Sequence, residues 1–212
     1  TVGAYYDLPE WDWSYDTEQT YTNTSHQGIQ EATGITALTN GTRVTKFELY
    51  FDTFQTSADR SASSNEWVIG SNGYDEAGGF LVGYWDSSTT GGISIAGQHL
   101  GGYGLDTGYG HSVNQWVGNK IVFNGCNTGS HGASNAETGG LSVYTRNVES
   151  PSSTSTNYGS STRWVHRGTM KHNQEYCDLS RINMGASSQY ANATRSSAFQ
   201  GKIKNVRIKI TV

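Results

Sequence analysis

The chain has 212 residues, a formal net charge of −4 and only 15% charged residues, with 27 glycines, 13 tyrosines and 6 tryptophans. This balance argues against nucleic acid as a partner, because phosphate binding needs a concentrated Lys and Arg footprint. Few prolines and methionines and many Gly, Tyr, Ser, Thr and Asn residues are typical of a turn-rich all-β protein.

The length suits one domain, residues 1-212. No stretch approaches the roughly 20 apolar residues of a membrane span, and no leader precedes Thr1, so we expect a processed chain or an excised domain without a membrane span. The pair Cys126 and Cys177 predicts one disulfide, and the alternative is two buried, unreactive thiols. Together with three glycosylation sequons, the disulfide favours a secreted, extracellular protein.

The first strand predictions come from the N-terminal half. The first thirty residues are rich in aromatic and acidic side chains, and we expect there a strand that pairs with the C-terminal one. Residues 45–52 alternate, with Phe47, Leu49 and Phe51 on a buried face. The opposite face of that strand carries Lys46, Glu48, Tyr50 and Asp52.

Further strands are predicted at 79–85, 115–123, 140–146 and 163–172. Two long segments between them, 97–111 and 150–162, are rich in Gly or in Ser and Thr and are predicted to be loops.

The last strand alternates apolar and charged side chains to the end of the chain. Its inward set is predicted to be Val206, Ile208, Ile210 and Val212, while Asn205, Arg207 and Lys209 point the other way.

The run from Phe199 to Ile208 has an aromatic-x-Gly-x-Ile-x-x-Val-x-Ile pattern, which resembles the closing strand of laminin-G and concanavalin A-like sandwiches. The earlier predicted strands follow the order of that superfamily, so the resemblance covers most of residues 40–212. It implies an all-β fold, an antiparallel β-sandwich or β-jelly roll. Members often bind structural calcium, for which loops near Asp7, Asp75 and Glu76 offer oxygen ligands, and no other cofactor is expected.

Two segments are similar in order and spacing to jelly-roll polysaccharide lyases of alginate and glucuronan. These are Lys46-Phe-Glu-Leu-Tyr50 and, fifty residues on, the pair Gln98 and His99. Lys46 stands where those lyases have arginine, and adjacent residues such as Gln98 and His99 face opposite sides of a regular strand.

The lyase resemblance implies roles for several side chains. Gln98, with Arg167 or Lys46, would neutralise a uronate carboxylate, and His99 or Tyr176 would transfer the proton. The final strand of the lyase pattern is missing, and Tyr176 is the nearest substitute for its tyrosine. The plainer alternative is that Lys46 belongs to a solvated strand face and that Gln98 and His99 are loop residues.

Candidate sugar-binding residues are aromatic and basic. Sugars stack on Trp and Tyr rings, and the candidates beside Gly or polar residues are Trp85, Tyr103, Tyr109 and Tyr190, together with Tyr50. Core packing is the expectation for Trp67, Trp116 and Trp164.

The segment 163–172 is the densest basic cluster. On a regular strand Arg163, Arg167 and Lys171 share one face, opposite His166 and His172. The basic face would suit a carboxylated or sulfated glycan if it lines the concave sheet, and is a solvated surface if it does not.

Two functions of different class follow. The first is a secreted polysaccharide lyase that cleaves an acidic, uronate-containing glycan by β-elimination. The second is a non-catalytic lectin, carbohydrate-binding or receptor-binding module. In both, the partner is a polysaccharide of acidic character. Glycoside hydrolysis is disfavoured, because no strand carries the paired carboxylates of jelly-roll glucanases, and Glu48 with Asp52 is the nearest arrangement.

Overall fold

Every regular element in the described part of this computed structural model is a β-strand, which confirms the all-β prediction. No helix there is long and apolar enough to cross a membrane. The structure describes residues 10–15, 19–21, 27–28, 43–55, 66–71, 79–84, 92–96, 105–110, 115–125, 140–148, 163–170, 172, 175–178, 182–184 and 201–211.

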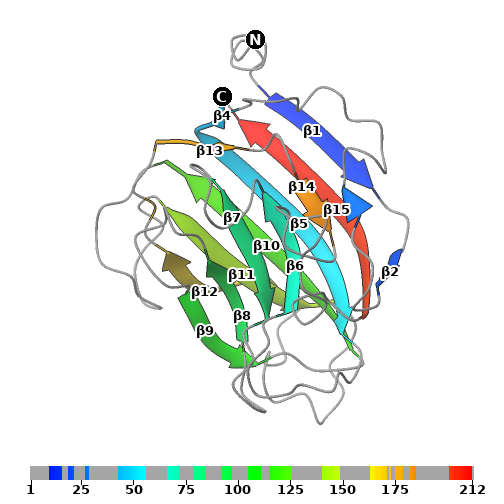
Figure 1. Cartoon of the computed structure of the whole chain (residues 1–212). Helices are drawn as coiled ribbons and strands as arrows, with labels where there is room; N and C mark the ends of the chain where they lie inside the picture. The colour runs from blue at the N-terminus through cyan, green and yellow to red at the C-terminus, as the bar shows by residue number, and fades with distance from the viewer. Residues whose placement is uncertain are drawn as a thin grey trace.

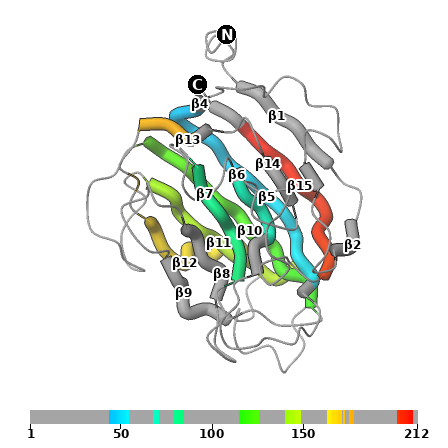
Figure 2. Tube along the Cα trace, in the orientation of Figure 1, coloured from blue at the N-terminus to red at the C-terminus, as the bar shows by residue number. Residues whose placement is uncertain are grey.

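One sheet has seven strands in the order β1-β15-β5-β10-β11-β12, with β2 also paired to β15. All of its pairs are antiparallel. Figure 2 shows β15 beside β5, followed by β10, β11 and β12. The strands are β1 (Glu10–Tyr15), β2 (Gln19–Tyr21), β5 (Lys46–Gln55), β10 (Trp116–Asn124), β11 (Leu141–Asn147), β12 (Val165–Met170) and β15 (Gly201–Thr211).

The second sheet has six strands in the order β3-β14-β6-β7-β8-β9, and it stacks against the first (Figure 1). The predicted antiparallel β-sandwich is therefore confirmed. Its strands are β3 (Gln27–Gly28), β14 (Ile182–Met184), β6 (Glu66–Ser71), β7 (Phe80–Tyr84), β8 (Gly92–Ala96) and β9 (Leu105–Gly110), and a separate pair joins β13 (Cys177–Asp178) to β4 (Arg43–Val44).

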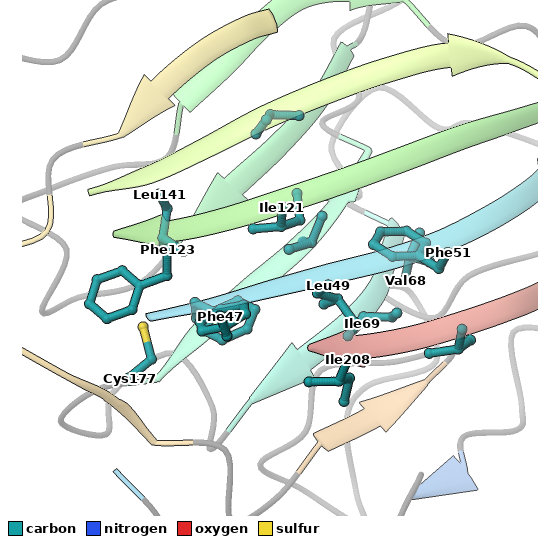
Figure 3. Packing of buried hydrophobic residues seen from close by; sticks show 14 of the residues in the cluster. Phe47, Leu49, Phe51, Val68, Ile69, Ile121, Phe123, Leu141, Cys177 and Ile208 are labelled. Atoms are coloured by element: carbon teal, nitrogen blue, oxygen red, sulfur yellow. The ribbon is translucent and has the colours of Figure 1, made fainter. Parts of the chain in front are cut away.

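The core lies between the two sheets, and strands β5, β7, β10 and β11 contribute alternate residues to it (Figure 3). On β5 these are the predicted Phe47, Leu49 and Phe51, all buried. The ring of Phe47 stacks on Phe80 of the facing sheet with 5.5 Å between centroids, and it also meets Phe123 at 5.7 Å. Burial of one face thus fixes which side of β5 points outward.

Strand β15 follows its prediction in part. Val206 and Ile208 are buried, and Asn205 and Arg207 are exposed, as expected. The alternation is not regular, however, because the register with β5 shifts between Lys204 and Arg207. This β-bulge leaves Asn205 with a positive φ of 54°. The side chains of Ile210 and Val212 lie outside the described residues.

Two other expectations have clear outcomes. The predicted N-terminal strand exists as β1, and it pairs with β15, with Trp13 opposite Ile208. The prediction of a loop over 97–111 is wrong for its second half, because β9 occupies Leu105–Gly110 and pairs with β8. The many glycines of that segment favour a loop in a prediction from sequence, but the segment forms a strand that is paired with β8.

Candidate functional site

The face of the seven-stranded sheet that points away from the core is called here the outer face. On strands β5, β10, β11, β12 and β15 it carries only two carboxylates, Glu48 and Asp52. On these five strands the outer face therefore has a positive surplus, although the net charge of the chain is −4. Seven of the 14 Lys and Arg residues lie there: Lys46, Lys120, Arg146, Lys202, Lys204, Arg207 and Lys209.

A row of five side chains crosses this face, one from each of five neighbouring strands. The strand register places each member directly opposite the next, where side chains are in reach of one another. Two cations alternate with two phenol rings along it, and an imidazole stands at one end. This cross-strand row consists of Arg207, Tyr50, Lys120, Tyr144 and His166.

The centre of the row is a lysine held among three rings. The Lys120 Nζ lies 4.4 Å from the Tyr144 ring centroid, 5.7 Å from Trp164 and 5.9 Å from Tyr50. The Tyr50 and Trp164 rings are 5.8 Å apart and tilted by 59°. Each cation–π contact restricts the lysine, so the ammonium group is held in place before any ligand arrives.

Hydrogen bonds orient two members of the row, Tyr50 and the terminal His166. Tyr50 donates its hydroxyl to Glu48 Oε2 at 2.5 Å. The His166 ring lies 5.1 Å from the Tyr144 ring, and its Nε2 is 2.9 Å from Thr169 Oγ1. These bonds orient one phenol and one imidazole on the outer face.

Two residues further along the strands, on the same face, a second set of side chains surrounds Gly118. Asp52 of β5 is opposite Gly118 on one side, and Arg146 of β11 is opposite it on the other. The Arg146 guanidinium carbon lies 4.7 Å from the Trp164 ring centroid. Asn205, at the β15 bulge, donates its amide to Asp52 Oδ2 at 2.8 Å.

The environment of Asp52 shifts its acidity. Burial is the largest influence and raises its pKa above the ordinary value of 3.8, against the lowering effects of the Asn205 hydrogen bond and of Arg146 and Lys204. Burial therefore raises the pKa of Asp52 by more than Asn205, Arg146 and Lys204 together lower it.

The structure separates the predicted basic residues. Lys46 is exposed on the outer face, and Tyr50 is half-buried there as predicted. Arg167 is only 7% exposed and donates its Nε to Thr145 Oγ1 at 2.8 Å on the inner side of the sheet. Lys46 and Arg167, the two alternatives for neutralising the carboxylate in the lyase interpretation, therefore lie on different faces of the sheet. The reason is a register shift, in which Tyr144 faces His166 and Val143 faces Gly168, so Arg167 is an inserted residue.

The two histidines of the basic segment also lie in different environments. His166 lies on the outer face, whereas His172 is fully buried, with its ring 4.6 Å from Phe123. Arg163 is exposed just before β12, Tyr176 is half-buried just before β13, and Tyr109 lies in β9. Of the residues singled out in the sequence, those that lie outside the described part are Asp7, Asp75, Glu76, Trp85, Gln98, His99, Tyr103, Cys126, Lys171 and Tyr190.

The predicted disulfide is not confirmed. Cys177 is a buried thiol whose Sγ lies 3.3 Å from His172 Nε2. Among the described residues no group of three or more His, Cys, Asp or Glu could hold a metal ion, and the calcium prediction falls on residues outside them.

Sequence reasoning missed most of the outer face. Trp116 and Trp164 were expected in the core, but they lie on the outer face, partly covered by their neighbours. Three other residues of this face, Lys120, Tyr144 and Arg146, were not predicted to be site residues. The available signal was the alternation of β10 and β11, in which Val117, Ile121 and Val143 mark the buried positions.

Comparison with known proteins supports the fold. A native heptameric SAP-like pentraxin from Limulus polyphemus matches with 8% identity and a TM-score of 0.53, covering 92% of this chain and 76% of that one. The CBM40 of the Ruminococcus gnavus IT-sialidase, bound to α2,3-sialyllactose, matches with 9% identity and a TM-score of 0.52, covering 93% and 90%. The PL-14 alginate lyase from Aplysia kurodai matches with 13% identity and a TM-score of 0.42, covering 96% and 91%.

At these identities the similarity shows the fold alone. It agrees with the concanavalin A-like jelly roll that the sequence resemblance implied. No protein-family model matches the chain, and no curated protein matches it at a significant level.

Proposed function

We propose that this protein binds an acidic carbohydrate on the outer face of its seven-stranded sheet. The observation that carries the proposal is the cross-strand row, in which the cations Arg207 and Lys120 alternate with the rings of Tyr50 and Tyr144, and His166 stands at one end. Rings supply surfaces for the apolar side of a sugar, and the cations between them supply partners for its carboxylates.

The arrangement of the row favours binding over a merely solvated surface. Tyr50, Lys120 and Trp164 are half-buried and restrain one another through ring and cation–π contacts. Side chains that are already ordered lose little conformational entropy when a ligand binds. The positive surplus on this face also attracts an anionic polymer to a protein whose net charge is negative.

The fold comparison is consistent with this proposal. The CBM40 of the R. gnavus IT-sialidase binds α2,3-sialyllactose and has the same fold as this chain. A carbohydrate-binding role outside the cell, in which the chain is secreted, is part of the proposal.

A second candidate is cleavage of the glycan by β-elimination. The observation that favours it is that two phenols and an imidazole, Tyr50, Tyr144 and His166, lie in the same row as Lys120. In this scheme Lys120 neutralises the uronate carboxylate, and a phenol or the imidazole removes the C5 proton. The C4–O bond then breaks, the leaving oxygen takes a proton, and the new chain end is an unsaturated uronate. Gln98, His99 and Tyr176 remain predictions for this scheme.

One experiment tests both candidates. The protein is titrated calorimetrically with alginate, polyglucuronate, ulvan, polygalacturonate and a neutral glucan, while ultraviolet absorbance reports any unsaturated uronate. We expect at least one acidic polymer to bind more tightly than the glucan, and Lys120→Gln to weaken that binding about tenfold or more. Lys209→Gln, which removes a charge at the margin of the same face, should weaken it less.

The readouts separate the outcomes. Binding with constant absorbance identifies a glycan-binding module, and a rise in absorbance identifies a lyase. Equal affinity for acidic and neutral polymers, or no binding to any of them, contradicts the proposal.

A further inference from the structure

Asp52 and Arg146 both lie over Gly118, in the space that a side chain at this position would fill. A Cβ at position 118 would lie 2.9 Å from Arg146 Cγ, 3.1 Å from Arg146 Nε and 3.3 Å from Asp52 Oδ1. The first of these distances is shorter than Cβ contacts in real proteins, so the Arg146 side chain would have to move. Glycine is thus the residue that allows the arginine to lie across β10 toward the carboxyl group.

Asp52 is oriented by an unusual backbone. The β15 bulge places Asn205 in the left-handed region, with φ at 54°, which is uncommon for a residue other than glycine. Its amide donates to Asp52 Oδ2, so the bulge directs this donor to the carboxyl group. The bond fixes one oxygen of Asp52 and sets the position of the other.

The Arg146 side chain is oriented by a ring contact, but not all of its hydrogen-bond donors have partners among the described residues. The Trp164 ring covers its guanidinium group at 4.7 Å, while the buried Nε has no hydrogen-bond partner among the described residues. No direct salt bridge joins Arg146 to Asp52 in the contacts of the described part, although the positive charge of Arg146 lowers the pKa of Asp52. Arg146 Nε and Asp52 Oδ1 lie 3.1 Å and 3.3 Å from the same point beside Gly118, yet no hydrogen bond joins them. Neighbouring guanidinium and carboxyl groups usually bond to each other.

Arg146 offers hydrogen-bond donors on one side of Gly118, and the Asp52 carboxyl group offers an acceptor on the other. This arrangement suits a ligand that carries both an acceptor and a donor. Resting on the proposed function, we infer that Arg146 and Asp52 form a subsite for one acidic sugar unit, with the sugar carboxylate bound by Arg146 and a hydroxyl of the same unit donating to Asp52. The planar guanidinium group binds carboxylates through paired hydrogen bonds, which an ammonium group does not. Gly118 is then the specificity-determining position, because it provides the gap between the two groups.

The charges around Asp52 agree with this assignment. Arg146 and Lys204 both stabilise its ionised form, and burial opposes them with the larger effect. A hydroxyl donor from the ligand replaces part of the hydration that burial removes.

The test compares each ligand with its carboxyl-reduced form, which keeps the sugar and loses the charge. Alginate, polyglucuronate, ulvan, polygalacturonate and 3′-sialyllactose are titrated in both forms against the wild type, Arg146→Gln, Gly118→Ala and Lys209→Gln. The wild type should prefer one acidic ligand over its reduced form by about tenfold or more. Arg146→Gln should lose most of that preference and keep its affinity for the reduced form.

The other variants are matched controls. Gly118→Ala should behave like Arg146→Gln, because the added methyl group displaces the arginine without removing a charge. Lys209→Gln loses one charge from the same face and should keep the preference ratio. Thermal unfolding of each variant tests whether the fold persists. Arg146→Lys, which keeps the charge, replaces any variant that does not fold. It should also lose the preference for the carboxylated ligand.

The results distinguish the two proposals. If no acidic ligand binds to the wild type, the proposed function and this subsite are both wrong. If the wild type binds and Arg146→Gln or Arg146→Lys retains the full preference for the carboxylated form, only the subsite is wrong. If the preference collapses in Lys209→Gln to the same extent, the recognition is spread over the face, and the subsite is likewise rejected.

Discussion

Lys204 lies over the indole ring of Trp116, with its Nζ 3.9 Å from the ring centroid. The lysine reaches across β5 to do so, because its own partner in the register is Asp52. Phe54 contacts the same indole at 5.5 Å, so Trp116 is only 8% exposed although it lies on the outer face. The two described tryptophans of this face therefore differ, since Trp164 stays half-buried beside Lys120 and Arg146.

The first prediction concerns this difference. Trp164→Ala should weaken the binding of an acidic polysaccharide about tenfold or more, because it removes an accessible ring and the support of two cations. Trp116→Phe, which changes the covered ring, should weaken it less. Affinity electrophoresis in gels containing the polysaccharide measures both. Equal losses in the two variants would show that Trp164 has no special part in binding.

The second prediction is a pH dependence of stability that originates at Asp52. Burial raises its pKa in the folded state above 3.8, so between that value and the folded-state pKa the folded protein binds more protons than the unfolded chain. The free energy of unfolding should therefore fall as pH rises through this window. Asp52→Asn cannot titrate and should show a flatter profile there. Urea unfolding at a series of pH values measures the difference, and parallel profiles would contradict the prediction.

The third prediction separates the two roles of Asn205. Asn205→Gly removes the hydrogen bond to Asp52 but tolerates the positive φ, whereas Asn205→Ala removes the bond and keeps the backbone strain. Both variants should raise the pKa of Asp52, because they remove an interaction that lowers it. Only the alanine variant should also lose about 1 kcal/mol or more of stability to strain. Carboxyl NMR titration and chemical unfolding provide the two readouts.

The fourth prediction concerns the core. Phe47 is 2% exposed and contacts rings from both sheets, Phe80 and Phe123. Phe47→Ala should lower the free energy of unfolding by about 3–5 kcal/mol, because it removes buried apolar surface and leaves a cavity between the layers. Val122→Ala, on the half-buried outer side of β10, should cost less. Guanidinium unfolding of both variants tests the assignment of inner and outer faces.

The inner and outer faces could largely be predicted from the sequence for strands that bury only one face. The period-two alternation of β5 identified Phe47 and Leu49 as inward and Glu48 and Tyr50 as outward, because a strand with one buried face must alternate. The same reasoning gave Val206 and Ile208. An N-terminal strand paired with β15 was expected as well, although the first thirty residues show no clear period.

The candidate site was not readable, for two physical reasons. Which residues stand opposite one another depends on register between strands distant in the sequence, so nothing local connects Tyr50, Lys120 and Tyr144. Bulges reverse the alternation without a sequence signal, which is why Arg167 was expected beside other basic residues and lies instead against Thr145.

The direction of the cross-strand row limits how a polymer can lie on the protein. Its five members come from five adjacent strands, so the row runs perpendicular to them and spans about 19 Å, four strand separations. A linear glycan that follows the row meets a different strand with each step, and its two ends meet different chemistry, Arg207 at one and His166 at the other. Affinity should therefore rise with oligosaccharide length until this span is filled and then level off, which titration with size-fractionated oligosaccharides measures. We expect the same asymmetry to favour one direction of the bound chain, with its reducing end toward one edge of the sheet.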